Sequence, residues 1–248
     1  ENPSKTRIYV EKDAGATLTL DGVYIDVSDK GASPLEIAED STGVVSVVLK
    51  GNNALTAGGY SAGIQKNGTA EGTLTISGGG ALIAKGGHTG AGIGSGDEKA
   101  ANNITISGGT VTAIGGKYGA GIGGGGNQGT GSNITISGGI VTATGGSCGA
   151  GIGGGSDGSG SNITISGGTV TATGGKQGAG IGGGDYGAAS NITISGGTVT
   201  ATGGHQGAGI GGGINEAGSN ISISGGTVIA TSSTTGEGGY SGAGIGGG

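Results

Sequence analysis

Large aromatic and sulfur-containing side chains are almost absent from this sequence. The chain has no Phe, Trp or Met, and aromatic residues make up 2% of its 248 positions. With a hydrophobic content of 31%, it lacks the large interlocking side chains that fill an ordinary globular core. Two prolines exclude a collagen-like chain, which needs abundant proline beside regularly spaced glycine. No run of about 18 apolar residues occurs, so we expect no insertion into a membrane.

Positive charge and cysteine are also scarce. The chain has 10 Lys and Arg against 16 Asp and Glu, which gives a net charge of −6. The lysines are scattered, so no basic stripe is available for nucleic acid. The single Cys148 permits no internal disulfide and leaves the redox compartment undecided. Residues 1–10 lack the features of a signal peptide, so the chain is either cytosolic or its signal was removed before position 1.

Glycine, by contrast, is abundant and belongs to a repeat. The chain has 72 glycines, about four times the usual share of roughly 7%. A strand-like block, NITISGG or a close variant, begins at Thr73, Asn103, Asn133, Asn162, Asn191 and Asn220. The motif AGI begins at Ala62, Ala91, Ala120, Ala150, Ala179, Ala208 and Ala243. LTLDG from Leu18 and VVLKG from Val47 are taken as early blocks and Leu35–Ile37 as an early AGI copy, so both markers predict eight units.

Each unit contains three short stretches with the alternation of a β-strand. In the first stretch, Ile163 and Ile165 share one face. In the second, Val170 and Ala172 share one face. In the third, the AGI motif, alternation predicts that Gly180 faces outward. A period of two excludes an amphipathic helix, and the glycine pairs between strands supply the positive φ angles that tight corners need.

Units of about 29 residues with three strands cannot bury their apolar side chains alone. Stacked at about 4.8 Å per turn, they form backbone hydrogen bonds from unit to unit. The sequence therefore predicts an all-β fold, a parallel β-helix solenoid of about eight coils, which we expect to be right-handed because strand crossovers favour that hand. One corner is predicted to carry a ladder of stacked asparagines formed by Asn133, Asn162, Asn191 and Asn220.

The repeats define the domain boundaries. Residues 16–248 are predicted to form a single β-helix domain, and the more charged residues 1–15 an N-terminal cap or a partial strand. The sequence stops directly after the third strand of the eighth unit. Because natural solenoids cap such open ends, we expect the domain to be truncated there. Exposed coil ends also predict self-association, end to end or laterally.

The motifs NITISGGTVTATGG and GAGIGGG, within residues 16–248, resemble glycine-rich repeat regions of secreted or wall-attached Firmicutes proteins. Those regions are similar to the pectate-lyase-like β-helix superfamily, which includes carbohydrate-binding domains, adhesins, polysaccharide lyases and some glycosidases. The resemblance implies a bacterial protein in an extracellular setting, either secreted or attached to the cell wall. It assigns no catalytic residue to this chain.

Two columns of side chains break the repeat between the double glycine and the AGI motif. Stacking places them about 5 Å from their neighbours in adjacent units. The residues expected to bind a ligand there are Tyr60, His88, Lys117, Tyr118, Lys176, Gln177, His205, Gln206 and Tyr240. Tyr rings stack on sugars, and Gln, His and Lys form hydrogen bonds, so a glycan is favoured, with a bare glycine surface beside it. The alternative is a solvated bend that tolerates any polar residue.

A second variable region follows the GIGGG motif and is rich in Asp and Asn. Asp157 and Asp185 are expected about one unit apart, where two carboxylates suit calcium or the acid and nucleophile of a retaining glycosidase. Such residues also favour turns for purely local reasons. The nucleophile elbow, HExxH, CxxC and phosphate-loop motifs are absent. The sequence therefore favours a protein without enzymatic activity and without a cofactor other than calcium.

The outward face of the second strand is rich in threonine, as in Thr169, Thr171 and Thr173. A flat threonine grid predicts ice binding, although threonine is also a common strand residue. The function expected from the sequence is a non-enzymatic extracellular stalk or adhesin segment with a glycan-binding surface. The alternatives are a fragment of a polysaccharide-degrading lyase or glycosidase and an ice-binding protein.

Overall fold

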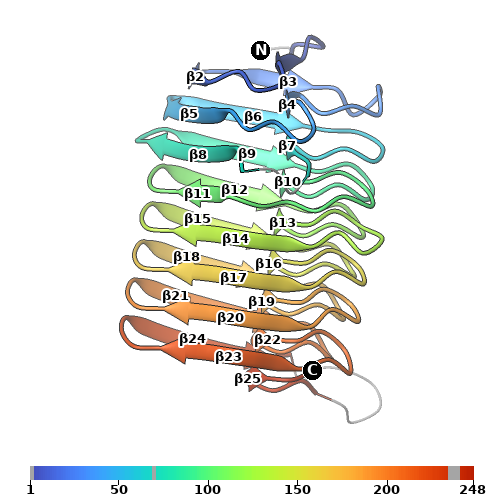
Figure 1. Cartoon of the computed structure of the whole chain (residues 1–248), viewed down its shortest axis with the longest axis vertical. Helices are drawn as coiled ribbons and strands as arrows, with labels where there is room; N and C mark the ends of the chain where they lie inside the picture. Colours follow the sequence, from blue (N-terminus) through green and yellow to red (C-terminus); the bar gives the residue numbers. More distant parts are fainter. Residues whose placement is uncertain (1–2, 69–70, 234–240) are drawn as a thin grey trace.

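The computed structural model describes residues 3–68, 71–233 and 241–248 as a column of stacked coils (Figure 1). Every coil contributes strands to three parallel sheets that run along the column. The strands of the first sheet are β2 (Ala16–Asp21), β5 (Val44–Lys50), β8 (Thr73–Gly78), β11 (Ile104–Ile106), β14 (Gly131–Ile136), β17 (Gly160–Ile165), β20 (Ala189–Ile194) and β23 (Gly218–Ile223). Within the described ranges there is no helix, and the predicted all-β parallel solenoid is confirmed.

The other two sheets complete each coil. The strands of the second sheet are β3 (Tyr24–Asp26), β6 (Asn52–Thr56), β9 (Ala81–Lys85), β12 (Thr110–Ile114), β15 (Ile140–Thr144), β18 (Thr169–Thr173), β21 (Thr198–Gly203) and β24 (Thr227–Ser232). The strands of the third sheet are β1 (Ile8–Val10), β4 (Leu35–Ile37), β7 (Ile64–Lys66), β10 (Ile93–Gly94), β13 (Ile122–Gly123), β16 (Ile152–Gly153), β19 (Ile181–Gly182), β22 (Ile210–Gly211) and β25 (Ile245–Gly246).

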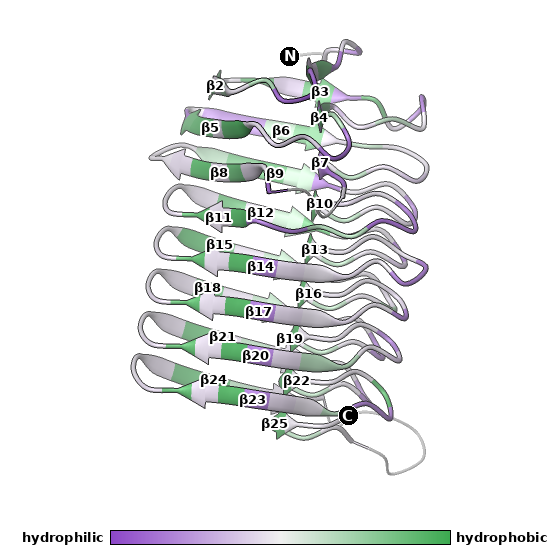
Figure 2. Cartoon of the chain, viewed as in Figure 1, coloured by the Kyte–Doolittle hydropathy of each residue, from purple (hydrophilic) through white to green (hydrophobic). Residues whose placement is uncertain are grey.

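The core is a set of aliphatic columns inside the three sheets. Ile163, Ile165 and Ala172 are fully buried and Val170 is 1% exposed, as their alternation predicted. Their neighbours in adjacent coils carry the same residues in register, so the apolar bands line up from coil to coil (Figure 2). Each buried Ile or Val contributes about 1.5–3 kcal/mol relative to exposure, and repetition compensates for the absence of large aromatics.

The glycine of the AGI motif is buried, and the prediction that it faces outward was wrong. Gly180 packs against the backbone of the next coil. A Cβ atom built there would lie 2.6 Å from the carbonyl oxygen of Gly209 and 2.7 Å from the amide nitrogen of Thr202. The short third-sheet strand therefore requires glycine for close packing between coils.

The strand register corrects two of the early repeat copies. Val45, two residues before Val47, pairs with Leu74, so the spacing stays at 29 residues there. Leu35 pairs with Ile64 rather than with the alanine of the AGI motif. Ile8 pairs in turn with Leu35, so the third sheet has nine strands and not the eight predicted copies. These early copies were misaligned because their sequences lack the NITISGG block.

The asparagine ladder is present and includes Asn103 as well as the predicted members. Asn133 donates to Asn103 over 3.2 Å, and Asn191 donates to Asn162 over 3.1 Å. Asn220 in turn donates to Asn191 over 3.1 Å. All five asparagines have φ between 51° and 55°, the left-handed region that asparagine tolerates better than most residues. The bonds form two runs, Asn103–Asn133 and Asn162–Asn191–Asn220, which fix the left-handed backbone just before β11 and within β14, β17, β20 and β23.

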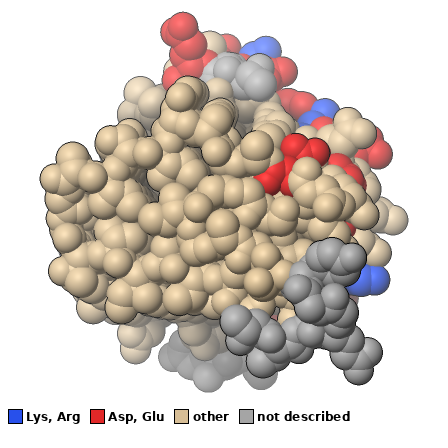
Figure 3. Space-filling view, turned by 90° about the horizontal axis from the view of Figure 1, so that it is seen from below, with Lys and Arg blue, Asp and Glu red and all other residues tan. Residues whose placement is uncertain are grey.

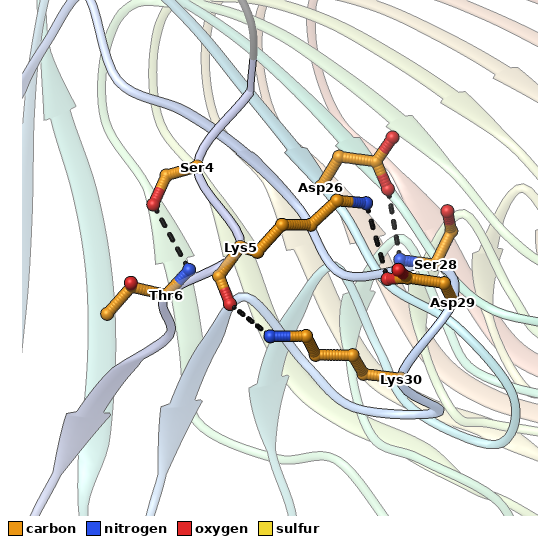
Figure 4. Close-up of polar contacts among 7 residues, drawn as sticks. All are labelled: Ser4, Lys5, Thr6, Asp26, Ser28, Asp29 and Lys30. Atoms are coloured by element: carbon orange, nitrogen blue, oxygen red, sulfur yellow. Dashed lines mark hydrogen bonds and ion pairs between the residues drawn. The ribbon is translucent and has the colours of Figure 1, made fainter.

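The N-terminal segment covers part of the first coil. Ser4 pairs with β3: its amide donates to Tyr24, and its carbonyl accepts from Asp26. Beyond it, Lys5 forms a 3.2 Å ion pair with Asp29, and the Lys30 ammonium donates to the carbonyl of Lys5 (Figure 4). At the opposite end, Ile223 and Ile245 are 41% and 48% exposed, whereas their counterparts in the preceding coil are fully buried.

Candidate functional site

Two loops of each coil form the most varied surface of the molecule. The first loop joins the second-sheet strand to the third-sheet strand, and the second loop joins the third-sheet strand to the next first-sheet strand. The first loop of one coil accepts backbone hydrogen bonds from the second loop of the following coil. These bonds run from Asp97 to Tyr60, Gly126 to Thr89, Ser156 to Tyr118, Asp185 to Cys148 and Ile214 to Gln177. The two variable regions, treated separately in the sequence, thus form one surface, here called the loop face.

Charged side chains are unevenly distributed over the surface. Seen from below, the blue and red groups lie along the upper and right edges of the molecule, and the left side shows none (Figure 3). Nearer the N-terminal end, Asp21 and Lys50 are exposed at the corner between the first and second sheets. The sheets are similar from coil to coil, whereas the loops differ from coil to coil in their side chains.

The predicted columns do stack from coil to coil. The amide of Tyr118 donates to the carbonyl of His88 over 3.3 Å, and that of Cys148 to Lys117 over 3.2 Å. Lys176 and His205 continue the first column, and Gln177 and Gln206 the second. Tyr60 was predicted to belong to the first column. Its carbonyl, however, accepts from the amide of Asp97 as the carbonyl of Tyr118 accepts from Ser156, so Tyr60 aligns with Tyr118 in the second column. Tyr240 lies outside the described residues.

The AGIGGG segments beside these columns do not form the expected bare glycine surface. Residues 119–126 and the equivalent segments in the neighbouring coils are buried. Their glycines pack on one another so closely that a Cβ on Gly155 would lie 1.7 Å from the carbonyl oxygen of Gly125. Glycine backbone does line the surface on the other side of the columns, where residues 174–175 and 203–204 border a hollow.

Tyr118 is held in place by its neighbours in the first column. The His88 ring meets it edge to face, with centroids 5.3 Å apart and an interplanar angle of 75°. The Lys117 ammonium lies 4.8 Å from the centroid of the Tyr118 ring. Such aromatic and cation–π contacts restrict the ring to one orientation. The ring is therefore an ordered, half-buried part of the surface.

The spacing in the sequence suggested that Asp157 and Asp185 occupy equivalent positions in adjacent coils. In the structure they do not. The amide of Asp185 bonds to the first loop, as the amide of Ser156 does one coil earlier, so Asp185 is the counterpart of Ser156. Asp157 matches Tyr186 instead, and both have left-handed φ angles, of 57° and 51°. Consequently Asp157 is exposed, whereas Asp185 is 8% exposed.

Asp185 is a buried carboxyl group with an unsatisfied oxygen. Its Oδ1 atom has no hydrogen-bond partner. Burial, and secondly the charge of Asp157, raise the pKa of Asp185. Burial, and secondly the charge of Asp185, likewise raise the pKa of Cys148, which approaches Gln177 with 4.0 Å between Sγ and Oε1. These shifts disfavour both the thiolate and the carboxylate.

Hollows on the described part of the loop face include three with different linings. The largest of these three, about 500 Å³, is lined by Glu98, Asn127, Gln128 and Asp157. A second, about 260 Å³, lies between Lys176 and His205. A third, about 120 Å³, includes Gln206 and Asn215. The first presents carboxylate and amide groups, whereas the second is mainly apolar and carries the side chains of Lys176 and His205.

Several loop-face residues lie outside the set of predicted binding residues, although Glu98 and Tyr186 belong to the variable region that follows the GIGGG motif. Ser156 shares a hydrogen bond of 3.0 Å with Asp157, and Glu98 lines the largest hollow. Tyr186 is an aromatic residue that is 52% exposed at positive φ, a conformation that costs free energy and is often kept at functional sites. The sequence shows that Tyr186 follows Asp185, but it does not show the left-handed backbone of Tyr186. Lys66 is buried, and its ammonium donates to Asn102 over 3.0 Å.

The described residues contain no group of three or more His, Cys, Asp or Glu side chains placed to hold a metal ion. Calcium at Asp157 and Asp185 therefore stays a prediction that would rest on two carboxylates and neighbouring oxygens. The described segments also contain no helix with the length and apolarity of a membrane span.

Comparison with known proteins identifies the repeat. The family model described as a beta helix repeat matches residues 74–97, 104–126, 134–156, 163–185, 192–214 and 221–248. Comparisons with curated proteins and with solved structures gave no match. The matched segments cover more than half of the chain and correspond to six consecutive coils. The chain therefore belongs to the beta helix repeat family.

Proposed function

We propose that this chain is a non-enzymatic extracellular module, a stalk or adhesin segment of a bacterial secreted or wall-attached protein, that binds a glycan on its loop face. The observation that carries the proposal is where the coils differ. Core positions such as Ile163 and Ile192 are the same from coil to coil, whereas the loop-face columns change residue in almost every coil. A repeat that only had to fill space would need no such change on one face.

The chemistry of the loop face supports a sugar ligand. Tyr60 and Tyr186 are 67% and 52% exposed, and Tyr118 is fixed by its neighbours. Aromatic rings offer apolar faces to sugar rings. Amides such as Gln177 and Asn127 both donate and accept hydrogen bonds, as hydroxyl groups require. The shallow hollows beside them suit an extended chain better than a small enclosed ligand.

A glycan array followed by calorimetry tests this function. The wild-type chain is expected to bind at least one glycan class, and Tyr118→Ala and Tyr186→Ala to weaken that binding at least about fivefold. Thr171→Ala is the matched control, since this exposed threonine lies on the second sheet, away from the loops. Absence of binding throughout the array, or equal binding by all variants, would reduce the module to a spacer.

Calcium is included in the proposal as an accessory ion. Asp185 has a buried oxygen without a partner, and Asp157 is near enough for its charge to act on Asp185. A divalent cation between them would relieve that repulsion. Calcium is expected to raise the melting temperature of the wild-type chain relative to EDTA and to have no effect on Asp157→Asn. An equal effect on both would contradict this site.

Polysaccharide cleavage is the first competing function, because two neighbouring carboxyl groups with different environments resemble an acid and base pair. Release of reducing sugar, abolished by Asp157→Asn, would replace the binding proposal.

Ice binding by the threonine face is the second competing function. Thr171 pairs with Thr142 and Thr200 in register, although Ile140 and Ile229 interrupt the grid. Thermal hysteresis that is lost in Thr171→Tyr would favour ice binding.

Self-association is also part of the proposal. The exposed Ile223 and Ile245 and the unpaired edges of the last coil are surfaces that other strands can cover. Light scattering over a dilution series is expected to show a mass that rises with concentration, and Ile245→Ser to reduce it. A constant monomeric mass would contradict the association.

A further inference from the structure

The hollow between Lys176 and His205 differs in charge from the rest of the loop face. It has a volume of about 260 Å³ and is lined by two equivalent segments of adjacent coils, 173–176 and 202–205, and by Ser233. We propose that this hollow binds the carboxylate or sulfate group of an acidic saccharide. The inference rests on the proposed glycan-binding function and names its ligand class.

Lys176 supplies the positive charge of this site. It is exposed, and none of the ion pairs found among residues 3–68, 71–233 and 241–248 uses it. Among the described residues that line the hollow there is no carboxylate. In a chain with a net charge of −6, a lysine without a described acid beside it makes this part of the surface locally positive. An ammonium group attracts sulfate and carboxylate oxygens through charge-assisted hydrogen bonds.

His205 adds a second hydrogen-bond donor to the lining. Its Nδ1 atom is buried and has no hydrogen-bond partner. A proton on that nitrogen would be a buried, unpaired N–H group, which costs about 1–3 kcal/mol. The preferred tautomer therefore carries its proton on Nε2, the ring nitrogen that is not enclosed in this way. The imidazole thus offers an N–H group to an acceptor in the hollow.

Hydroxyl groups add polar atoms to a lining whose accessible surface is otherwise mainly apolar. Thr173, Thr202 and Ser233 border the hollow. The Thr202 hydroxyl accepts a 3.5 Å hydrogen bond from Thr231, so its own proton is available to another acceptor. A ligand group that only accepts hydrogen bonds satisfies this lining better than a sugar hydroxyl, which must also find an acceptor.

The neighbouring groove on the same face has the opposite character. Glu98 and Asp157 line it together with two amides, and these carboxylates repel an anion. An acidic saccharide is therefore expected to place its charged group beside Lys176. Lys50 provides the matched comparison, because it is an exposed lysine at the end of β5 and lies outside the loop face.

Nuclear magnetic resonance titration of the ¹⁵N-labelled full chain tests the proposal. The probes are galactose 6-sulfate and glucuronic acid, their neutral counterparts galactose and glucose, and inorganic sulfate. Both acidic sugars are expected to shift the amides of Gly174, Gly175, Gly203 and Gly204 and to bind at least about tenfold more tightly than the neutral sugars. The tighter of the two acidic sugars identifies the group as sulfate or carboxylate.

The variants separate the charge from the fold. Lys176→Gln and His205→Gln are expected to remove most of the preference for acidic sugars, while Lys50→Gln keeps it. Because Lys176 is exposed, its variant tests the site even if His205→Gln does not fold. Equal binding of acidic and neutral sugars would overturn this inference and leave the proposed function standing. Equal binding of inorganic sulfate would overturn the saccharide assignment, and an empty glycan array would overturn both proposals.

Discussion

The amide nitrogen of Asp185 donates to the carbonyl oxygen of Cys148 over 2.7 Å. This bond joins the second loop of one coil to the first loop of the coil before it. It also places a carboxyl group and a thiol in the same partly buried environment. The loop face is thus built from pairs of residues that are distant in the sequence and are held together by the stacked coils.

Replacing Asp185 by Asn is expected to stabilise the chain at pH 7 in EDTA. The folded pKa of Asp185 is raised above its ordinary value of 3.8, so its contribution to stability is favourable below that value and is lost as the pH rises through the folded pKa. The variant should therefore gain about 1 kcal/mol or more at pH 7, and the gain should shrink towards pH 4. Urea denaturation at both pH values measures it. A loss of stability at pH 7 would mean that the hydrogen bonds of the carboxyl group with Cys148 and the Tyr186 backbone outweigh the cost of burying it.

The Cys148 thiol is expected to react slowly with iodoacetamide. Burial, followed by the charge of Asp185, raises the pKa of Cys148, while Lys117 acts in the opposite direction. A raised pKa lowers the fraction of reactive thiolate. At pH 8 the wild-type chain should react more slowly than glutathione, Asp185→Asn faster than wild type, and Lys117→Gln more slowly than wild type. Equal rates in all three chains would show that access alone controls the reaction.

The asparagine ladder predicts a difference between two substitutions at Asn191. This residue donates to Asn162, accepts from Asn220 and has φ of 55°. Alanine loses both hydrogen bonds and is strained in the left-handed region, so Asn191→Ala should cost about 2–3 kcal/mol. Asn191→Gly keeps the backbone conformation and should cost about 1 kcal/mol less than alanine. Chemical denaturation of the two variants gives the comparison, and identical costs would show that the left-handed backbone is not strained.

The buried glycine of the AGI motif should not tolerate a methyl group. A Cβ on Gly180 would lie 2.6 Å from a carbonyl oxygen of the next coil, whereas one on Gly79 meets no atom within 4 Å. Gly180→Ala is expected to cost about 1–3 kcal/mol through overpacking, and the control Gly79→Ala to cost much less. Thermal denaturation followed by circular dichroism measures both. Similar melting temperatures for the two variants would contradict the tight packing between coils.

Much of the fold could be predicted because its determinants are local and repeated. The alternation of Ile163 and Ile165 identifies a strand with one buried face, and six similar blocks at nearly equal spacing require those strands to stack. The early copies were misaligned where the repeat block is absent, since alternation alone is unchanged by a shift of two residues. Leu35 was therefore placed two residues out of register.

The sequence by itself determined the period, the inward residues, the asparagine corner and the confinement of variation to two regions in each coil. Only the tertiary structure decided that these regions meet, that Asp157 and Asp185 differ in position and exposure, and that Gly180 is buried. The physical reason is that strand faces follow from neighbours in the chain. Loop contacts, however, depend on how each loop folds back and which backbone groups of the adjacent coil remain unpaired.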